Sequence, residues 1–192
     1  MEKGEILFHF ALKGEKNVDF TEKIYFPPVE NKNMPNDLLK SLLDNLMLIL
    51  GISYWKTYCP KEIIIENNFL TKDQADFWNS VYTKGLGEFF YKNKIDFKGF
   101  IKFPYDEKTE VKPASFSRKD RTLLGLGGGK DSIVASEMLK SQNKPFDVFT
   151  VGTSLIQEQV AKIMGNPPIV IMRQLDPKLF ELNKTSDVYN GH

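Results

Sequence analysis

The feature that most constrains the fold of this chain is a glycine-rich turn that joins an apolar run to a predicted helix. Residues 123–126 are apolar apart from one glycine and predict a strand, and Gly127, Gly128 and Gly129 follow directly. Lys130 comes next, and the predicted helix begins at Asp131. Such a turn is typical of loops that hold phosphate groups, because the first N–H groups of the helix lack partners within it and point towards an anion.

Three phosphate-loop patterns can be compared with this turn. The Walker pattern ends in Gly-Lys-Ser/Thr, and it fails because Asp131 follows Lys130. The dinucleotide pattern Gly-x-Gly-x-x-Gly, started at Gly125, requires a glycine where Lys130 stands. The third pattern, Ser-Gly-Gly-x-Asp-Ser, belongs to the ATP pyrophosphatases, and the turn resembles it with Gly127 in place of the usual serine. The turn is therefore predicted to bind pyrophosphate; the alternative is a strand-to-helix turn whose glycines serve packing alone.

The residues of the loop suit a pyrophosphate and a magnesium ion. Glycines let the backbone approach an anion closely and adopt positive φ. Lys130 offers a positive charge and Ser132 a hydroxyl donor, whereas Asp131 would repel phosphate unless it binds Mg²⁺ or caps the helix. The predicted ATP contacts are therefore residues 127–132, with Asp131 as metal ligand and catalytic residue.

Strands and helices alternate after the loop. The patterns predict strands at 121–126, 146–152 and 169–172, and helices at 131–142, 154–164 and 177–183. Alternation at this spacing indicates a parallel sheet with crossover helices. Open parallel sheets bind ligands at the carboxyl ends of their strands, so Gly152, Thr153 and Arg173 are also predicted to contact the nucleotide. Three strands make a thin parallel sheet, because such sheets usually contain more strands. The chain is therefore expected to be a fragment of a longer protein.

Residues 1–115 follow a different rhythm and are predicted to form an α+β accessory domain that recognises the substrate. The predicted elements are a hairpin at 6–12 and 18–26, a helix at 38–52, an irregular segment at 53–60, a strand at 63–65, a helix at 72–85 and a turn at 85–91. Thr71 and Gln74 have the spacing of a capping box. A shift in composition places the boundary near 112–120. The fold class is therefore α/β, with residues 116–192 as the first part of a parallel-sheet domain of the ATP-pyrophosphatase (PP-loop) type.

Composition narrows the range of partners. The formal net charge of +1 predicts neither a nucleic acid nor a membrane surface as partner. Cys59 is the single cysteine, which excludes an internal disulfide and favours a reducing cytoplasm. The N-terminus lacks a signal-peptide pattern, and the apolar run at 46–52 is too short to span a bilayer. A soluble cytoplasmic protein is expected.

Further motifs resemble one bacterial enzyme family. They are Tyr54-Trp55-Lys56-x-x-Cys59-Pro60, Gly85-Leu86-Gly87-Glu88-Phe89-Phe90, the loop from Gly127 to Ser132, and Asn190-Gly191-His192. Together they are similar to the UDP-N-acetyl-α-D-muramoyl-L-alanyl-L-glutamate epimerases over most of the chain. Among these motifs only the loop is specific by itself.

The resemblance implies a reaction. Family members are expected to invert the terminal L-glutamate of UDP-MurNAc-L-Ala-L-Glu, a peptidoglycan precursor, with ATP and Mg²⁺. Adenylation would neutralise a carboxylate, after which a base could remove the neighbouring Cα proton and an acid could return it on the other face. The loop would hold the pyrophosphate that leaves in the first step. The resemblance also implies a chain longer than 192 residues, so this segment would lack part of the catalytic domain.

Residues outside the loop are candidates for substrate binding or catalysis. Glu88, set among aromatic residues, is a candidate base with a raised pKa, and a solvent-facing carboxylate is the alternative. Trp55 and Lys56 are candidates for contacts with the uracil ring and a phosphate, against core packing and a solvated lysine. His192 is a candidate phosphate ligand or acid/base. Cys59 is interpreted as a buried small side chain, although its role stays open.

Two other function classes remain compatible with the sequence. One is a different adenylating enzyme with the same loop, which transfers an amide or thiol group. The single cysteine and near-neutral charge weigh against its tRNA-thiolating members. The other class is a nucleotide-binding module without catalysis. Substrate-dependent release of pyrophosphate separates such a module from the enzymes.

Overall fold

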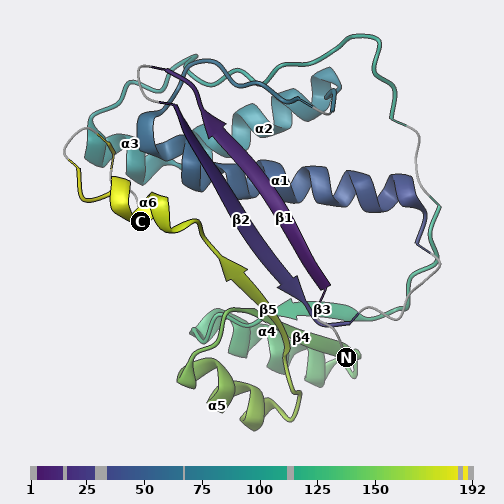
Figure 1. The fold of residues 1–192 in the computed structure, drawn as a ribbon. Coiled ribbons are helices and arrows are strands. Elements are labelled where there is room, and N and C mark those ends of the chain that lie inside the picture. Colours follow the sequence, from purple (N-terminus) through teal and green to yellow (C-terminus); the bar gives the residue numbers. More distant parts are fainter. Residues whose placement is uncertain are drawn as a thin grey trace. The chain divides into compact units, whose positions relative to one another are not determined.

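The computed structural model describes residues 4–14, 17–28, 34–66, 68–111, 115–185 and 188–189. These residues form the predicted α/β class of structure, with five strands and six helices (Figure 1). The chain divides into two compact units, each built from separate stretches of sequence. Unit 1 contains the described residues of Met1–Phe8, Thr21–Asn33 and Phe116–Leu175, and unit 2 contains those of His9–Phe20, Met34–Ser115 and Asp176–His192.

The parallel sheet predicted after the glycine loop is confirmed in unit 1. β3 (Thr122–Gly125), β4 (Phe146–Val151) and β5 (Ile169–Gln174) run parallel to one another. α4 (Lys130–Ser141) connects the first two strands and α5 (Leu155–Met164) the second two. The chain moves through β3, β4 and β5 in one direction, so two right-handed crossovers place both helices on the same face of the sheet (Figure 1).

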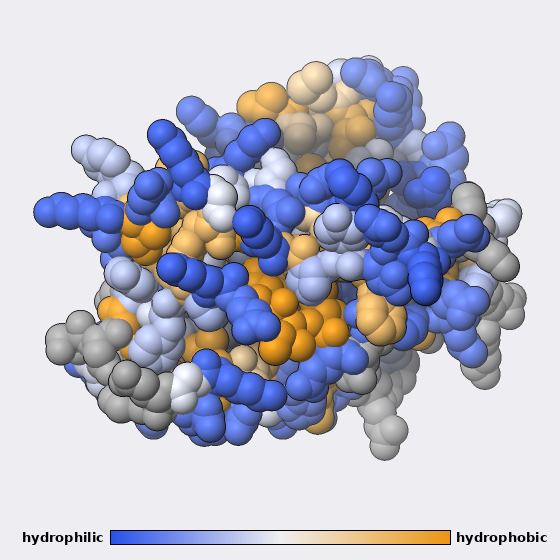
Figure 2. All heavy atoms as spheres, turned by 90° about the horizontal axis from the view of Figure 1, so that it is seen from above, coloured by the Kyte–Doolittle hydropathy of each residue, from blue (hydrophilic) through white to orange (hydrophobic). Residues whose placement is uncertain are grey.

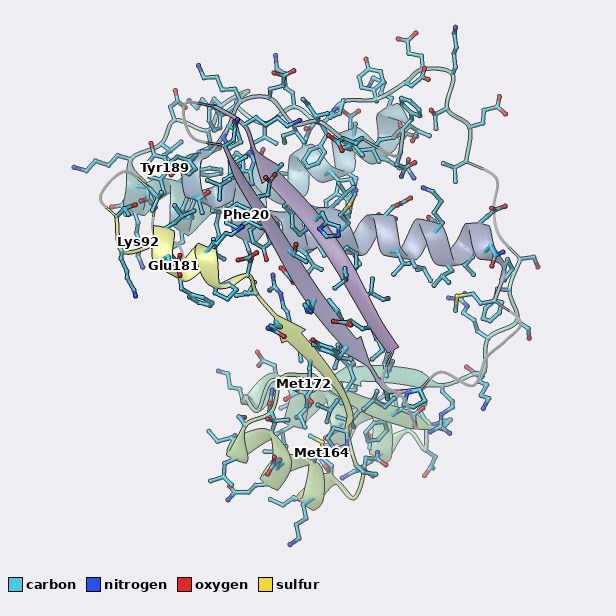
Figure 3. All side chains as sticks on the ribbon, in the orientation of Figure 1. Phe20, Lys92, Met164, Met172, Glu181 and Tyr189 are labelled. Atoms are coloured by element: carbon cyan, nitrogen blue, oxygen red, sulfur yellow. The ribbon has the colours of Figure 1, made fainter. Side chains whose placement is uncertain are left out.

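Apolar side chains between these strands and helices form the core of unit 1. The cluster joins strand residues to helix residues: Leu126, Phe146, Val148, Leu139, Ala161 and Met164. Met164, at the end of α5, is labelled in Figure 3. Strand residues alternate between the two faces of a sheet. The buried positions 146, 148 and 150 of β4 therefore face the helices, and the intervening positions lie on the opposite face.

The sheet also contains the N-terminal hairpin, which was predicted to belong to the accessory domain. β1 (Gly4–Leu12) and β2 (Val18–Phe26) are the two predicted strands, and β2 pairs antiparallel with β5. The register sets Ile24 opposite Arg173, and the strand order is β1-β2-β5-β4-β3. The parallel strands are thus part of a mixed sheet, and each hairpin strand contributes residues to both units.

Three helices build the central part of unit 2. They are α1 (Asn36–Tyr58), α2 (Lys72–Gly85) and α3 (Gly87–Asn93), while a fourth helix, α6 (Pro177–Leu182), comes from the end of the chain. α2 begins with the predicted capping box. The Thr71 hydroxyl accepts the Gln74 N–H at 3.2 Å, and the Thr71 N–H donates to the Gln74 side chain at 3.0 Å.

Aromatic rings fill the core of unit 2. Trp55 lies edge-on to Tyr82, Phe90 and Phe100, with ring centroids 5.7–6.2 Å apart. The Tyr82 hydroxyl donates to the Leu48 carbonyl at 2.6 Å, so the one polar atom of that buried ring has a partner. Edge-to-face pairs add about 0.5–1.5 kcal/mol each beyond the area they bury. Aromatic pairing therefore contributes to the stability of unit 2.

The irregular segment predicted at 53–60 is wrong, because residues 53–58 complete α1. Tyr54 and Trp55 are buried, so the last turns of the helix are held by tertiary packing. The helix ends at Cys59, whose φ of 48° is left-handed, and its N–H bonds the Trp55 carbonyl at 2.9 Å. Pro60 then prevents continuation.

Two shorter segments also differ from their predictions. Residues 63–65 form no strand, although their three isoleucines favour one. A strand requires a pairing partner, and the described sheet is made by β1 to β5 alone. Residues 87–93 form α3 instead of continuing a turn. Both differences show tertiary context overriding local preference.

Some apolar side chains remain at the surface. Figure 2 shows a patch of hydrophobic residues (orange) surrounded by hydrophilic ones on the face seen from above.

α1 is long and apolar enough to cross a membrane by length and composition, with a mean hydropathy of 1.2 over its most apolar window. A core helix of a soluble protein meets the same test. This one helix is therefore weak support for a membrane span, and the predicted absence of a membrane partner stays a prediction.

Candidate functional site

The glycine loop, residues 127–132, lies between the end of β3 and the first turn of α4. Gly128 has a φ of 84°, a conformation that favours glycine. Gly129 is the N-cap of α4 with φ −90° and ψ 170°, and no side chain caps the helix there. The Ser132 hydroxyl donates to the Gly129 carbonyl at 2.9 Å. The first N–H groups of α4 are therefore the donors that the loop offers to an anion.

The start of α5 lies against the glycine loop. The hydroxyl of its N-cap, Ser154, accepts the Gln157 N–H at 3.3 Å. The Gln157 side-chain amide donates to the Leu126 carbonyl at 3.1 Å and so ties α5 to the end of β3. A Cβ added to Gly128 would lie 3.0 Å from Ile156 Cγ2. Two helix N-termini thus flank the loop, and the dipole of each favours negative charge there.

Ile156 and Gln157 were not among the predicted site residues. A signal for Gln157 was present, because Ser154 and Gln157 have the spacing of a capping box. The Gln157 side chain does not close that box but donates across the loop to Leu126. No pattern signals Ile156, since its contribution is to occupy the space that a side chain at Gly128 would need.

Gly152 and Thr153 follow β4 at the same edge of the sheet as the glycine loop. β3 and β4 are parallel neighbours, so the connections after them leave from the same edge. Gly152 has a φ of 76°, and its N–H donates to the Ile171 carbonyl at 2.8 Å. Thr153 is exposed. The structure brings these residues to the predicted edge, and their contact with a nucleotide stays a prediction.

The surface of the loop fits a pyrophosphate group. A Cβ added to Gly127 or Gly129 would meet nothing within 4 Å, so the backbone is open to a ligand at both positions. Lys130 and Asp131 are exposed in the first turn of α4. Open backbone, a helix N-terminus and a lysine together form a donor set suited to phosphate oxygens.

A magnesium ion would find one carboxylate at the loop. In the part of the chain that the structure describes, no group of three or more His, Cys, Asp or Glu side chains is placed to hold a metal. Mg²⁺ usually keeps several waters and is bound by one or two carboxylates together with substrate phosphates. Asp131 therefore fits a metal that arrives with a nucleotide, and it does not form a metal site without one.

Arg173, a predicted nucleotide contact, forms a two-point ion pair with Glu22 of β2. Arg173 Nε lies 2.6 Å from Glu22 Oε1, and Nη2 lies 3.1 Å from Oε2. The Glu22 side chain is fully buried, whereas 30% of the Arg173 side chain is exposed. The guanidinium therefore ties the hairpin to β5. A nucleotide contact by Arg173 stays a prediction.

The raised pKa expected for Glu88 is wrong. Its carboxylate is 78% exposed and forms an ion pair with Lys92 at 2.5 Å, one turn further along α3. The hydrogen bond from Lys92, and then its charge, lower the pKa of Glu88. Lys92 is labelled in Figure 3. The pKa therefore gives no support to Glu88 as a base, and that role stays a prediction.

Trp55 and Lys56, the predicted uridine contacts, have different environments. Trp55 is 6% exposed, and its indole N–H donates to the Pro60 carbonyl at 3.0 Å. Core packing therefore leaves little of the ring for a uracil. The Lys56 ammonium lies 5.8 Å from the centre of the Phe89 ring, within cation–π distance. Contact of either residue with substrate stays a prediction, and His192 lies outside the described residues.

We expect Cys59 to be unreactive in the folded protein. Burial raises the pKa of its thiol from 9.0 to about 12, against a smaller lowering by Lys56. Because only the thiolate is nucleophilic, a thiol reagent at pH 8 should label the native chain at least roughly a hundredfold more slowly than the chain in guanidinium. The raised pKa also means that ionisation of the unfolded chain lowers stability as the pH rises above 9.0. Equal labelling rates would contradict this burial.

The arrangement defines an α/β protein whose glycine loop follows β3, the outermost strand of the sheet. The loop lies at the carboxyl ends of the parallel strands, where open sheets of this kind bind ligands. Comparison with known proteins gives the family. A family model described as the MurL N-terminal domain matches residues 1–192. The chain belongs to this family, and the resemblance drawn from its motifs is confirmed.

Three curated relatives are named UDP-N-acetyl-alpha-D-muramoyl-L-alanyl-L-glutamate epimerase. The chain is 35% identical to the protein of Xanthomonas oryzae pv. oryzae, over 80% of this chain and 34% of the relative. It is 33% identical to that of Salinispora tropica, over 100% of this chain and 42% of the relative. It is 34% identical to that of a Micromonospora species, over 98% of this chain and 43% of the relative. The chain thus spans well under half the length of these relatives, and no solved structure matches it.

Proposed function

We propose that this chain is the ATP-binding part of an ATP- and Mg²⁺-dependent epimerase. The full-length enzyme would invert the terminal L-glutamate of UDP-MurNAc-L-Ala-L-Glu during synthesis of peptidoglycan precursors. The names of the relatives support the substrate and the reaction. The observation that supports ATP binding is the glycine loop, whose open backbone lies between the N-termini of α4 and α5. A cytoplasmic location is part of the proposal, since the single cysteine suits a reducing compartment.

ATP solves a chemical difficulty in this reaction. The Cα proton beside a carboxylate is very weakly acidic, because its removal places a second negative charge next to the first. Transfer of the adenylyl group of ATP to that carboxylate, with pyrophosphate leaving, would remove the first charge. A base could then take the Cα proton and an acid could return one on the opposite face. Water would finally release AMP and restore the carboxylate.

The residues of unit 1 would contribute binding and charge stabilisation. The N–H groups at the start of α4, with the Lys130 ammonium, would hold the leaving pyrophosphate and stabilise its developing charge. Asp131 would hold Mg²⁺ against the phosphate oxygens. Ile156 and Gln157 would keep the loop in its open conformation by their contacts with Gly128 and Leu126. The base that removes the Cα proton is not assigned to a residue.

Deuterium incorporation tests the proposal. The full-length family protein is incubated in D₂O with Mg²⁺-ATP and UDP-MurNAc-L-Ala-L-Glu, and the glutamate Cα is examined by NMR. We expect deuterium at Cα, with release of pyrophosphate and AMP. An unlabelled Cα would sink the epimerase proposal. Pyrophosphate released without label would indicate another adenylating enzyme, and nucleotide binding without pyrophosphate release would indicate a module without catalysis.

We expect Asp131→Asn to raise the Mg²⁺ concentration needed for half-maximal turnover by roughly tenfold or more, because an amide is a poorer ligand for a hard cation. The free energy of unfolding should change by less than about 1 kcal/mol, as for other charges at helix N-termini. Glu137→Gln is the matched control, since Glu137 is exposed on the same helix and pairs with Lys140 at 2.9 Å. An unchanged magnesium requirement would show that Asp131 does not bind the metal and only places a favourable charge at the N-terminus of α4.

A further inference from the structure

One face of the parallel strands in unit 1 carries five apolar side chains, three of them exposed and two half-buried. This open face comprises Leu123 of β3, Phe149 and Val151 of β4, and Ile169 and Ile171 of β5. The register sets Phe149 opposite Ile169 and Val151 opposite Ile171, so these side chains share one side of the sheet. Leu123 is 60% exposed, Val151 53% and Ile169 41%.

The helices of unit 1 leave the open face uncovered. α4 and α5 both pack on the other face, where Leu126, Val148 and Met164 are buried. Parallel sheets occur almost only where both faces are covered, because their strands are apolar on both sides. An exposed apolar face of this kind is characteristic of a surface that another element covers.

The position of β3 in the sheet gives a second, independent indication. β3 is the last strand in the order β1-β2-β5-β4-β3, so its outer edge has no partner among the described strands. Open α/β sheets bind ligands where the strand order reverses, which requires a strand on each side of the loop-bearing strand. A strand beside β3 would create this reversal next to the glycine loop. By the right-handed rule, a helix connecting β5 to that strand would cross the open face.

We propose that the open face and the free edge of β3 are the docking site for the segment by which the longer relatives exceed this chain. The match leaves more than half of each relative outside it, which is ample for a strand and several helices. The family model describes an N-terminal domain, so that extra length follows the matched part. The occupant is a strand beside β3 with an apolar helix across Phe149 and Val151. The exposure of the open face does not depend on the proposed function, whereas the strand beside β3 is inferred from the ligand-binding role proposed for the glycine loop.

Cysteine accessibility tests the docking site. Cys59 is buried and its thiol pKa is raised to about 12, so the native background of labelling is low. Leu123→Cys and Val151→Cys place a thiol on the open face. Ile163→Cys is the matched control, because Ile163 is 84% exposed on α5, which packs on the other face. Maleimide labelling is measured in the 192-residue chain and in the same chain extended by the remainder of the Micromonospora relative.

We expect all three thiols to react at similar rates in the 192-residue chain. In the extended chain, the two thiols of the open face should react at least about tenfold more slowly, since a covered thiol reacts only through transient opening. The Ile163→Cys thiol should stay fast. Equal rates at all three positions of the extended chain would overturn the proposal. Labelling of the open-face thiols in the 192-residue chain that slows as the protein concentration rises would also overturn the proposal, because a second copy of the chain would then cover the face.

A measurement on the native relative covers the case in which the extended chain does not fold. Hydrogen exchange is compared between the full-length Salinispora tropica protein and a version cut after its matched part. We expect the segment aligned with β3 to exchange roughly tenfold or more slowly in the full-length protein, because its edge amides gain partners. Unchanged exchange there would reject a strand beside β3.

Discussion

Replacing Gly128 with alanine is expected to destabilise the folded chain by about 2 kcal/mol or more and to weaken nucleotide binding at least roughly tenfold. A left-handed residue with a side chain costs about 1–2 kcal/mol, and Gly128 has a φ of 84°. The new Cβ would also lie 3.0 Å from Ile156 Cγ2. Ile156 is β-branched and stiff at χ1, so it cannot easily turn aside. Urea denaturation measures the loss of stability, and calorimetric titration with Mg²⁺-ATP measures binding.

Two further variants separate the causes of this effect. Gly127→Ala adds a Cβ that meets nothing within 4 Å, so stability should stay within about 0.5 kcal/mol of the parent. Adding Ile156→Ala to Gly128→Ala removes the steric contact and leaves the backbone strain, so part of the lost stability should return. Equal effects of Gly128→Ala and Gly127→Ala would show that the geometry of Gly128 does not matter for the loop.

Arg173→Met is expected to destabilise the chain by about 3 kcal/mol or more, the cost of removing one member of a buried ion pair. The fully buried carboxylate of Glu22 would lose the guanidinium that now contacts both of its oxygens. Adding Glu22→Leu should restore much of the loss, because an apolar pair of similar volume replaces the ion pair without a buried charge. Urea denaturation of both single variants and the double variant gives the coupling.

The exposed counterpart of this pair provides the control. Arg121 contacts Asp147 in the same two-point geometry, with Nε 2.8 Å and Nη2 2.6 Å from the carboxylate oxygens. Both side chains are over 40% exposed. Exposed pairs contribute roughly 0–1 kcal/mol, so Arg121→Met should cost far less than Arg173→Met. Similar losses for the two substitutions would show that burial of Glu22 does not set the strength of the pair.

Local sequence signals predicted much of the fold, but they did not predict which distant strands pair. β3, α4, β4, α5 and β5 follow from apolar periodicity and glycines that lie within each segment. The alternation of Val18–Phe26 predicts a strand with one buried face, but it does not show what covers that face or which strand pairs with it. The pairing of β2 with β5 was therefore outside the reach of sequence patterns. The last turns of α1 were missed because burial of Tyr54 and Trp55 stabilises them.

The candidate site shows the same division. The glycine loop was found because its pattern is contiguous, whereas Ile156 reaches Gly128 only through the packing of α5 against the end of β3. The error over Glu88 followed from the missed helix α3. Once residues 87–93 are helical, Glu88 and Lys92 stand at i and i+4, and an ion pair that lowers the pKa of Glu88 follows.

The pairing of β2 with β5 has a consequence during protein synthesis. Glu22 and Arg173 are 151 positions apart, so at about 5–20 residues per second the hairpin leaves the ribosome roughly 8–30 s before its partner strand. The stretch of unit 2 at residues 34–115 is contiguous and is available much earlier. Helices α1 to α3 of the nascent chain are therefore expected to fold first, and until β5 is synthesised one edge of β2 remains unpaired. Ribosomes stalled before residue 169 should display a hairpin that is sensitive to protease, and those stalled well beyond residue 174 should not.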